Sequence, residues 1–268
     1  MTASFIGGWV LVSLVAVADT TGAPAGLPKG YEECLGDRPA VFRRANELYE
    51  RGNLAEAEAG YRFLIENGAK NGYIHYNLGN ACFRGGHLGR AIVEYERALQ
   101  YLPRHPDVRH NLGFVRNLMV DEELKPKEYG AILGLILGLH SMLNLRESLI
   151  VLAVVLWLVG VTYSLRILLP DSAVTRQTGG IRASLVIILA FCVVSVSVKA
   201  YRSEHRDRAV VLAPASEAKT GPDTSYSTAF LLHEGTTVRL GVQRPGWAQI
   251  RLPNGLTGWL KSEDLEVI

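Results

Sequence analysis

The sequence is poor in cysteine and has no dense run of basic residues. Its three cysteines, Cys34, Cys82 and Cys192, lie far apart and form no CxxC pair. This spacing excludes a paired-cysteine zinc site and a disulfide framework, although a single Cys34–Cys82 bridge stays open. Lys and Arg are interleaved with Asp and Glu, and the net charge is +2 over 268 residues. The chain therefore lacks the basic stripe of a nucleic-acid-binding protein.

Catalytic motifs are missing as well. The seven histidines show no HExxH spacing. No GxSxG or P-loop pattern occurs, and the glycines stand at turns and helix contacts. We therefore expect no catalytic residue, no enzymatic activity, no metal, no cofactor and no small-molecule substrate.

Apolar residues, by contrast, are concentrated in long runs. The first covers Phe5 to Ala18 and ends in the small residues Ala16 and Ala18, which is typical of a signal-peptide cleavage site. We predict a signal peptide over 1–18. No basic residue precedes the run, so an uncleaved membrane anchor is the alternative.

Two further apolar segments are long enough to cross a membrane as helices. Asn144 followed by Glu147 is typical of a capping box and predicts a helix start. Residues 149–165 carry no charge, and because Arg166 can reach the interface, the first span extends over 147–169. The second span covers 181–200. The pair predicts a transmembrane hairpin, with a buried helix pair in a soluble domain as the alternative.

Within 126–145, the apolar stretch Ala131–Leu139 is too short to span a bilayer. Gly130, Gly134 and Gly138 recur every four residues and would share one helix face. We interpret the stretch as an interfacial helix, with a plain amphipathic linker as the alternative.

A repeat of 34 residues precedes these segments. Asn77-Leu78-Gly79 recurs as Asn111-Leu112-Gly113 at that distance, and small or aromatic residues keep the same spacing. The best copy carries Leu78, Gly79, Gly86, Ala91, Tyr95, Ala98 and Pro103, and in this it resembles the tetratricopeptide repeat.

The resemblance implies an all-α tetratricopeptide solenoid over 28–125, with repeats near 38–71, 72–105 and 106–120. The last copy supplies only its first helix. Because a repeat cannot bury its apolar face alone, the array needs residues 28–37 or a partner to cover its ends.

Short apolar runs divided by turn residues fill 208–268. Trp247, Gln249 and Arg251 alternate with Ala248, Ile250 and Leu252, which predicts half-buried strands. Pro253-Asn254-Gly255 indicates a hairpin turn, and the short strands indicate a small closed β-barrel. The segment resembles the bacterial SH3-like domain.

In this order the segments resemble the tetratricopeptide membrane protein of the Bacteroides aerotolerance (Bat) operon. The resemblance implies a membrane-anchored scaffold with protein partners, among them von Willebrand type A domain membrane proteins and a MoxR-type ATPase. It also implies a multi-pass protein of the bacterial inner membrane, whose soluble domains we expect in the periplasm.

Tetratricopeptide folds bind protein segments in a groove lined by the first helix of each repeat. Carrying this over by position predicts a protein-binding groove, although Tyr76 and Phe83 fit equally well as core residues. The competing function is cell-wall or glycan binding by the SH3-like domain through Trp247 and Trp259, but both stand where such a barrel is usually filled, so a structural role is preferred. The predicted groove residues are Asn46, Tyr49, Tyr76, Asn80, Phe83, Arg84, His110 and Phe114.

Overall fold

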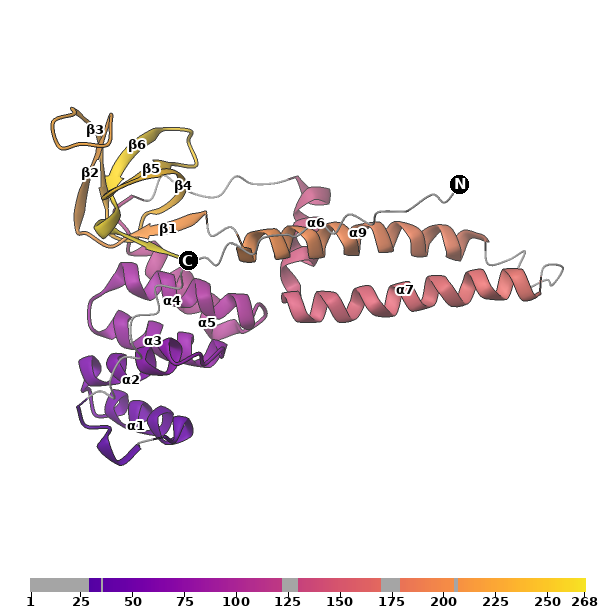
Figure 1. The fold of residues 1–268 in the computed structure, drawn as a ribbon, viewed down its shortest axis with the longest axis horizontal. Coiled ribbons are helices and arrows are strands. Elements are labelled where there is room, and N and C mark those ends of the chain that lie inside the picture. The colour runs from indigo at the N-terminus through magenta and orange to yellow at the C-terminus, as the bar shows by residue number, and fades with distance from the viewer. Residues whose placement is uncertain (1–28, 35, 122–129, 170–178, 205–206) are drawn as a thin grey trace, which may run out of the picture.

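The computed structural model describes residues 29–34, 36–121, 130–169, 179–204 and 207–268. The predicted signal peptide, 1–18, lies outside these residues. Within them, five helices are followed by three apolar helices and a β-sheet. The helices and the sheet gather at one end of the two long apolar helices (Figure 1).

The first four helices form two antiparallel pairs of the expected repeat, and the fifth is the first helix of a third copy. They are α1 (Arg38–Glu50), α2 (Leu54–Glu66), α3 (Gly72–Arg84), α4 (Leu88–Tyr101) and α5 (Pro106–Asn117). The Asp37 carboxylate caps α1 by accepting from the Ala40 N–H, and Asn71 caps α3 by accepting from the Tyr73 N–H. Gly86 has a φ of +82° in the turn before α4, a backbone conformation that favours glycine.

Small residues allow α3 and α4 to pack closely, as their spacing predicts. A Cβ atom on Gly79 would come within 2.7 Å of the Tyr95 ring, which is fully buried. Ala91 and Ala98, on α4, are also fully buried. The repeat register inferred from the sequence is therefore confirmed in its central copy.

Residues before α1 cover the first end of the helical array. Tyr31 precedes the short 3-10 helix η1 (Glu32–Cys34) and is fully buried. Its hydroxyl donates to the Glu56 carbonyl oxygen at 2.9 Å, and its ring fills the space beside Gly60. Cys34 and Cys82 are both buried and free, so they form no bridge.

The apolar helices are α6 (Ala131–Met142), α7 (Leu145–Leu168) and α9 (Gly179–Glu204). The capping box at the start of α7 is confirmed, because the Asn144 side chain accepts from the Glu147 N–H and Glu147 accepts from the Asn144 N–H. The helices α7 and α9 pack side by side, and each is long and apolar enough to cross a membrane. The short helix α6 runs across them at the end near the repeats (Figure 1).

Polar contacts tie the repeat helices to this end of the apolar pair. The Arg104 guanidinium donates to a Glu147 carboxylate oxygen at 2.6 Å, and the Asn144 amide donates to the Tyr101 carbonyl oxygen at 3.4 Å. Beside them, the Lys199 ammonium on α9 donates to the Ser148 hydroxyl at 2.6 Å. The loop between α4 and α5 thus lies against the start of α7.

The C-terminal strands form one antiparallel sheet. They are β1 (Arg208–Val211), β2 (Ala215–Lys219), β3 (Thr228–His233), β4 (Thr237–Arg244), β5 (Trp247–Arg251), β6 (Thr257–Lys261) and β7 (Leu265–Val267), the last preceded by the 3-10 helix η2 (Ser262–Asp264). Their order in the sheet is β3-β2-β6-β5-β4-β1-β7.

The sheet is open, so the predicted closed barrel is wrong. Among the described residues, β3 pairs only with β2 and β7 only with β1. The edge strand β7 is short, and both β7 and its neighbour β1 contact helix α4. A helix therefore covers the edge that a barrel would close with another strand.

The β1 strand has two buried faces. Ala209 and Val211 belong to the core of the sheet, whereas Val210 belongs to the core of the repeat helices. On the other side of the contact, a Cβ atom on Gly235 would overlap the Met119 sulfur, so Met119 packs directly on the turn before β4. The sheet thus packs on α4 and on Met119, which follows α5.

Charged groups surround this junction. The Asp121 carboxylate accepts from the Thr236 hydroxyl at 2.6 Å, from the His233 N–H at 2.9 Å and from the His233 ring at 2.9 Å. Burial opposes ionisation of Asp121, but these hydrogen bonds outweigh it and lower the pKa of the carboxyl. Arg97 on α4 binds both Glu94 at 2.6 Å and Glu266 at 2.9 Å.

Candidate functional site

The predicted groove residues lie on α1, α3 and α5, and we call the surface they form the first-helix face. Two of them, Asn46 and Asn80, serve the packing of the repeats. The Asn46 amide oxygen accepts from the Tyr61 hydroxyl at 2.7 Å and from the Asn77 amide at 3.1 Å. The same arrangement recurs 34 residues later. It forms a ladder of hydrogen bonds between successive repeats.

In the second rung of the ladder, the Asn80 amide oxygen accepts from the Tyr95 hydroxyl at 2.8 Å and from the Asn111 amide at 2.9 Å. Burial raises the pKa of Tyr61 and Tyr95, which keeps both phenols protonated as donors. The two asparagine oxygens are therefore occupied within the protein.

Four other predicted residues form two contact pairs, one between α1 and α3 and the other between α3 and α5. The Arg84 guanidinium carbon lies 4.6 Å from the centre of the Tyr49 ring, and its Nη1 donates to the Tyr49 carbonyl oxygen at 3.1 Å. Phe83 meets Phe114 edge to face, with ring centres 5.8 Å apart. We call these four residues the Tyr49–Phe114 line.

The Tyr49–Phe114 line is accessible. Phe114 is 50% exposed and Arg84 is exposed, whereas Tyr49 and Phe83 are half-buried against the repeat core. A guanidinium held over a ring retains further N–H donors for a ligand. The line can therefore offer both apolar contact and hydrogen bonding to a bound segment.

The last two predicted residues differ in exposure. Tyr76 is half-buried, packs on the repeat core and lies 5.6 Å from the His105 ring, centre to centre. His110 is exposed, one helical turn before Phe114 on α5. Sequence reasoning left Tyr76 open between groove and core, and its contacts are those of a core residue.

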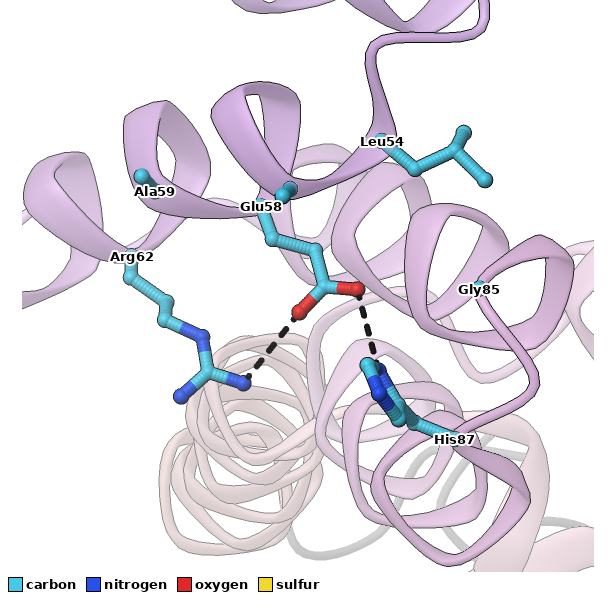
Figure 2. A pocket seen from close by; sticks show the side chains of 7 residues that line it. Leu54, Glu58, Ala59, Arg62, Gly85 and His87 are labelled. Carbon is cyan, nitrogen blue, oxygen red and sulfur yellow. Dashed lines mark hydrogen bonds and ion pairs between the residues drawn. The ribbon is translucent and has the colours of Figure 1, made fainter. Parts of the chain in front are cut away.

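A pocket of about 380 Å³ lies elsewhere, between α2 and the turn that joins α3 to α4 (Figure 2). Glu58, a buried carboxylate at its centre, binds His87 at 3.3 Å and Arg62 at 3.6 Å. Both carboxylate oxygens are thus engaged by side chains of the pocket itself. This arrangement fastens α2 to the turn, and none of the predicted groove residues lines it.

The chemistry near this pocket is unreactive. Burial raises the pKa of the Cys82 thiol to about 12, so it stays protonated at neutral pH and is a poor nucleophile. Across the described ranges, no group of three or more His, Cys, Asp or Glu side chains could hold a metal ion.

The structure also corrects the expected position of two tryptophans. The alternation of β5 is as predicted, because Ala248 and Ile250 are buried. Trp247 therefore points to the opposite face, and Trp259 joins it there because it pairs directly with Gln249. Both tryptophans are half-exposed and lie outside the sheet core, so they do not fill it.

Sequence reasoning missed the ladder partners Asn77 and Asn111 and the junction residue Asp121. The recurrence of Asn at a spacing of 34 was a usable signal for the ladder. No local signal marks Asp121, since its partners Thr236 and His233 lie more than a hundred residues away.

Comparison with known proteins supports the helical part of this description. A family model of the tetratricopeptide repeat matches residues 72–105, which hold α3 and α4. A search of curated proteins returned no match to the chain. The chain therefore contains a tetratricopeptide repeat, a module that suggests protein interaction.

Proposed function

We propose that this chain is a membrane-anchored scaffold that binds a protein partner through its first-helix face. The observation that carries the proposal is the Tyr49–Phe114 line. Aromatic and arginine side chains supply most of the binding energy in protein interfaces when they cluster at an accessible site. Here they cluster on the helices that line the groove of tetratricopeptide folds, beside a repeat that matches this family.

Membrane anchoring by α7 and α9 is supported by what the two helices expose. Trp157 is 67% exposed and Ile187 is 70% exposed, each within a long run of apolar neighbours. Exposing that much apolar surface to water is unfavourable by about 25 cal/mol per Å². In a bilayer the same surface is solvated by lipid. The grouping of repeats and sheet at one end supports a hairpin with both on one side of the membrane (Figure 1).

The finer assignment follows the sequence resemblance. We propose that the sheet is an SH3-like domain and that the chain belongs with the Bat operon scaffolds. Von Willebrand type A domain proteins and a MoxR-type ATPase are then its expected neighbours. On this proposal, residues 1–18 are a signal peptide, and the repeats and sheet lie on the periplasmic side of a bacterial inner membrane.

The test is a crosslinking pull-down from membranes with the variant Arg84→Ala, Phe114→Ala. Both side chains are accessible and neither belongs to the asparagine ladder, so the fold should persist. We expect recovery of protein partners to be lost, with membrane insertion unchanged. Arg38→Ala with Tyr226→Ala removes an exposed arginine and an exposed ring elsewhere, and it serves as the matched control.

The sheet is the competing binding module. Removing the sheet by truncation before Arg208 would also remove Val210 from the core of the repeat helices, so a loss of binding could not be assigned to the sheet. Trp247→Ala with Trp259→Ala is the cleaner comparison. If that variant loses the partners while Arg84→Ala, Phe114→Ala keeps them, binding resides on the sheet and our proposal is wrong.

A further inference from the structure

Three arginines lie directly opposite one another across three neighbouring strands. Arg208 on β1 pairs with Arg239 on β4, and Arg239 pairs with Arg251 on β5. Like charges in directly opposed positions destabilise a sheet. Arg208 is compensated by Glu96 at 3.1 Å. Within the described part of the chain, Arg239 and Arg251 have no carboxylate partner.

These arginines belong to a larger surface. Val238 and Ile250 point into the sheet core, so Arg239 and Arg251 point outward by strand alternation. Direct pairing puts further residues on the same outward side. Gln249 and Thr257 lie on this side as well, and Lys261 pairs with Glu263 at 3.2 Å. We call this surface the basic sheet face, and its basic and aromatic residues are Arg239, Arg244, Trp247, Arg251, Trp259 and Lys261.

The basic sheet face extends toward the long apolar helices. The β1 strand begins at Arg208, shortly after α9 ends at Glu204, on the side of the sheet that faces α9 (Figure 1). The β4 strand runs antiparallel to it and passes its start, since the Leu240 N–H donates to the Asp207 carbonyl oxygen at 2.7 Å. A bulge lies between Leu240 and Gln243, and the paired strand β5 covers the same stretch in three residues, from Ile250 to Trp247. At about 3.3 Å per residue, the β4–β5 hairpin therefore extends roughly 10 Å beyond Asp207.

We propose that the basic sheet face binds the phosphate groups of anionic phospholipids in the bilayer that α7 and α9 cross, a step that rests on the membrane anchoring proposed above. Guanidinium groups bind phosphate with paired hydrogen bonds, and tryptophan is enriched where lipid meets water. A sugar ligand would explain the two tryptophans but not the two arginines that lack a carboxylate partner. The surface of an anionic bilayer explains both, because phosphate pairs with arginine and the lipid–water interface favours tryptophan.

Headgroup binding would orient the whole extramembrane part. The sheet is fixed to α4 through Val210 and to Met119 through the turn at Gly235. Holding the sheet against the lipid surface would therefore hold the repeat helices, and the first-helix face with them, at one orientation to the bilayer.

The experiment uses the full chain reconstituted into vesicles of phosphatidylcholine, with or without phosphatidylglycerol. An environment-sensitive dye is attached to Val242→Cys, which is 53% exposed in the hairpin, whereas the three native cysteines are buried. We expect a blue shift of the dye only when phosphatidylglycerol is present, and its loss at high salt. Arg239→Gln with Arg251→Gln should weaken docking about 30-fold, from about 1 kcal/mol for each basic residue near an anionic surface.

The control is Arg38→Gln with Arg43→Gln, which removes two exposed arginines from α1 and should keep the shift. The proposal is overturned if the dye responds equally in both vesicles, or if the Arg239, Arg251 variant responds like the parent. It is also overturned if inorganic phosphate or soluble peptidoglycan fragments produce the shift in neutral vesicles.

Flotation of each sample separates this proposal from the proposed membrane anchoring, because a chain that does not float with the vesicles refutes the anchoring itself. The arginine variant should not melt at a lower temperature, since it relieves repulsion.

Discussion

Val210 provides the sharpest test of how the sheet and the repeat helices depend on each other. Its side chain is fully buried among the repeat helices although it belongs to β1. Val210→Ala removes two buried carbon atoms at about 0.8 kcal/mol each and leaves a cavity. We therefore expect a loss of about 2–3 kcal/mol. If the sheet completes the helical array, the loss is felt in α4 as well as in β1.

Hydrogen exchange of the full chain, measured peptide by peptide, separates these regions. A loss of about 2–3 kcal/mol corresponds to exchange about 30- to 150-fold faster in protected amides. Val242→Ala makes the same chemical change at a valine of the same sheet that is 53% exposed, and it should have little effect. If Val210→Ala accelerates exchange in β1 but leaves α4 unchanged, the two parts are independent and the reasoning fails.

Three further predictions concern the packing. Asn80→Ala leaves the Tyr95 hydroxyl and the Asn111 amide without their acceptor and should cost about 1–3 kcal/mol in urea unfolding, while adding Tyr95→Phe should cost little more. The lowered pKa of Asp121 means that its stabilisation is complete above the usual aspartate pKa of about 4 and is lost as the pH falls through the lowered value. Melting of the sheet followed from about pH 6 to about pH 2 should show this loss, and Asp121→Asn should remove it. Ala91→Arg puts an unpaired charge into a fully buried site and should cost several kcal/mol, so an unchanged melting midpoint would show that the helix register is wrong.

Local features of the fold could be predicted from the sequence because short-range chemistry determines them. The capping box of Asn144 and Glu147 requires only the two side chains and the helix between them. The contact of Gly79 with Tyr95 follows from the repeat spacing, and the buried side of β5 follows from its alternation. Each involves residues on one element or on neighbouring elements.

Features that depend on distant partners could not be predicted. Val210 and Val211 are neighbouring valines in one strand. Val210 lies in the repeat core and Val211 in the sheet core only because the sheet packs against the repeat helices. For the same reason the sequence indicated a closed barrel, whereas α4 covers the margin at β1 and β7.

The helices that carry the predicted groove residues could be predicted from the sequence, but the contacts of those side chains could not. The repeat spacing placed Asn80 and Arg84 on one face. It did not reveal that the Asn80 oxygen is occupied by Tyr95 and Asn111, whereas Arg84 keeps donors available. Which side chains remain accessible depends on contacts between repeats, and a position within one repeat does not specify these.

A photoreactive amino acid at position 114 tests the central claim most directly. Phe114 is the most exposed ring of the Tyr49–Phe114 line, so a bound partner segment must pass close to it. In native membranes we expect illumination to give a discrete crosslink to another protein, which disappears when Arg84→Ala is added. Adducts with lipid alone, or a protein crosslink obtained from position 259 and not from position 114, would contradict the claim that the repeat helices bind the partner.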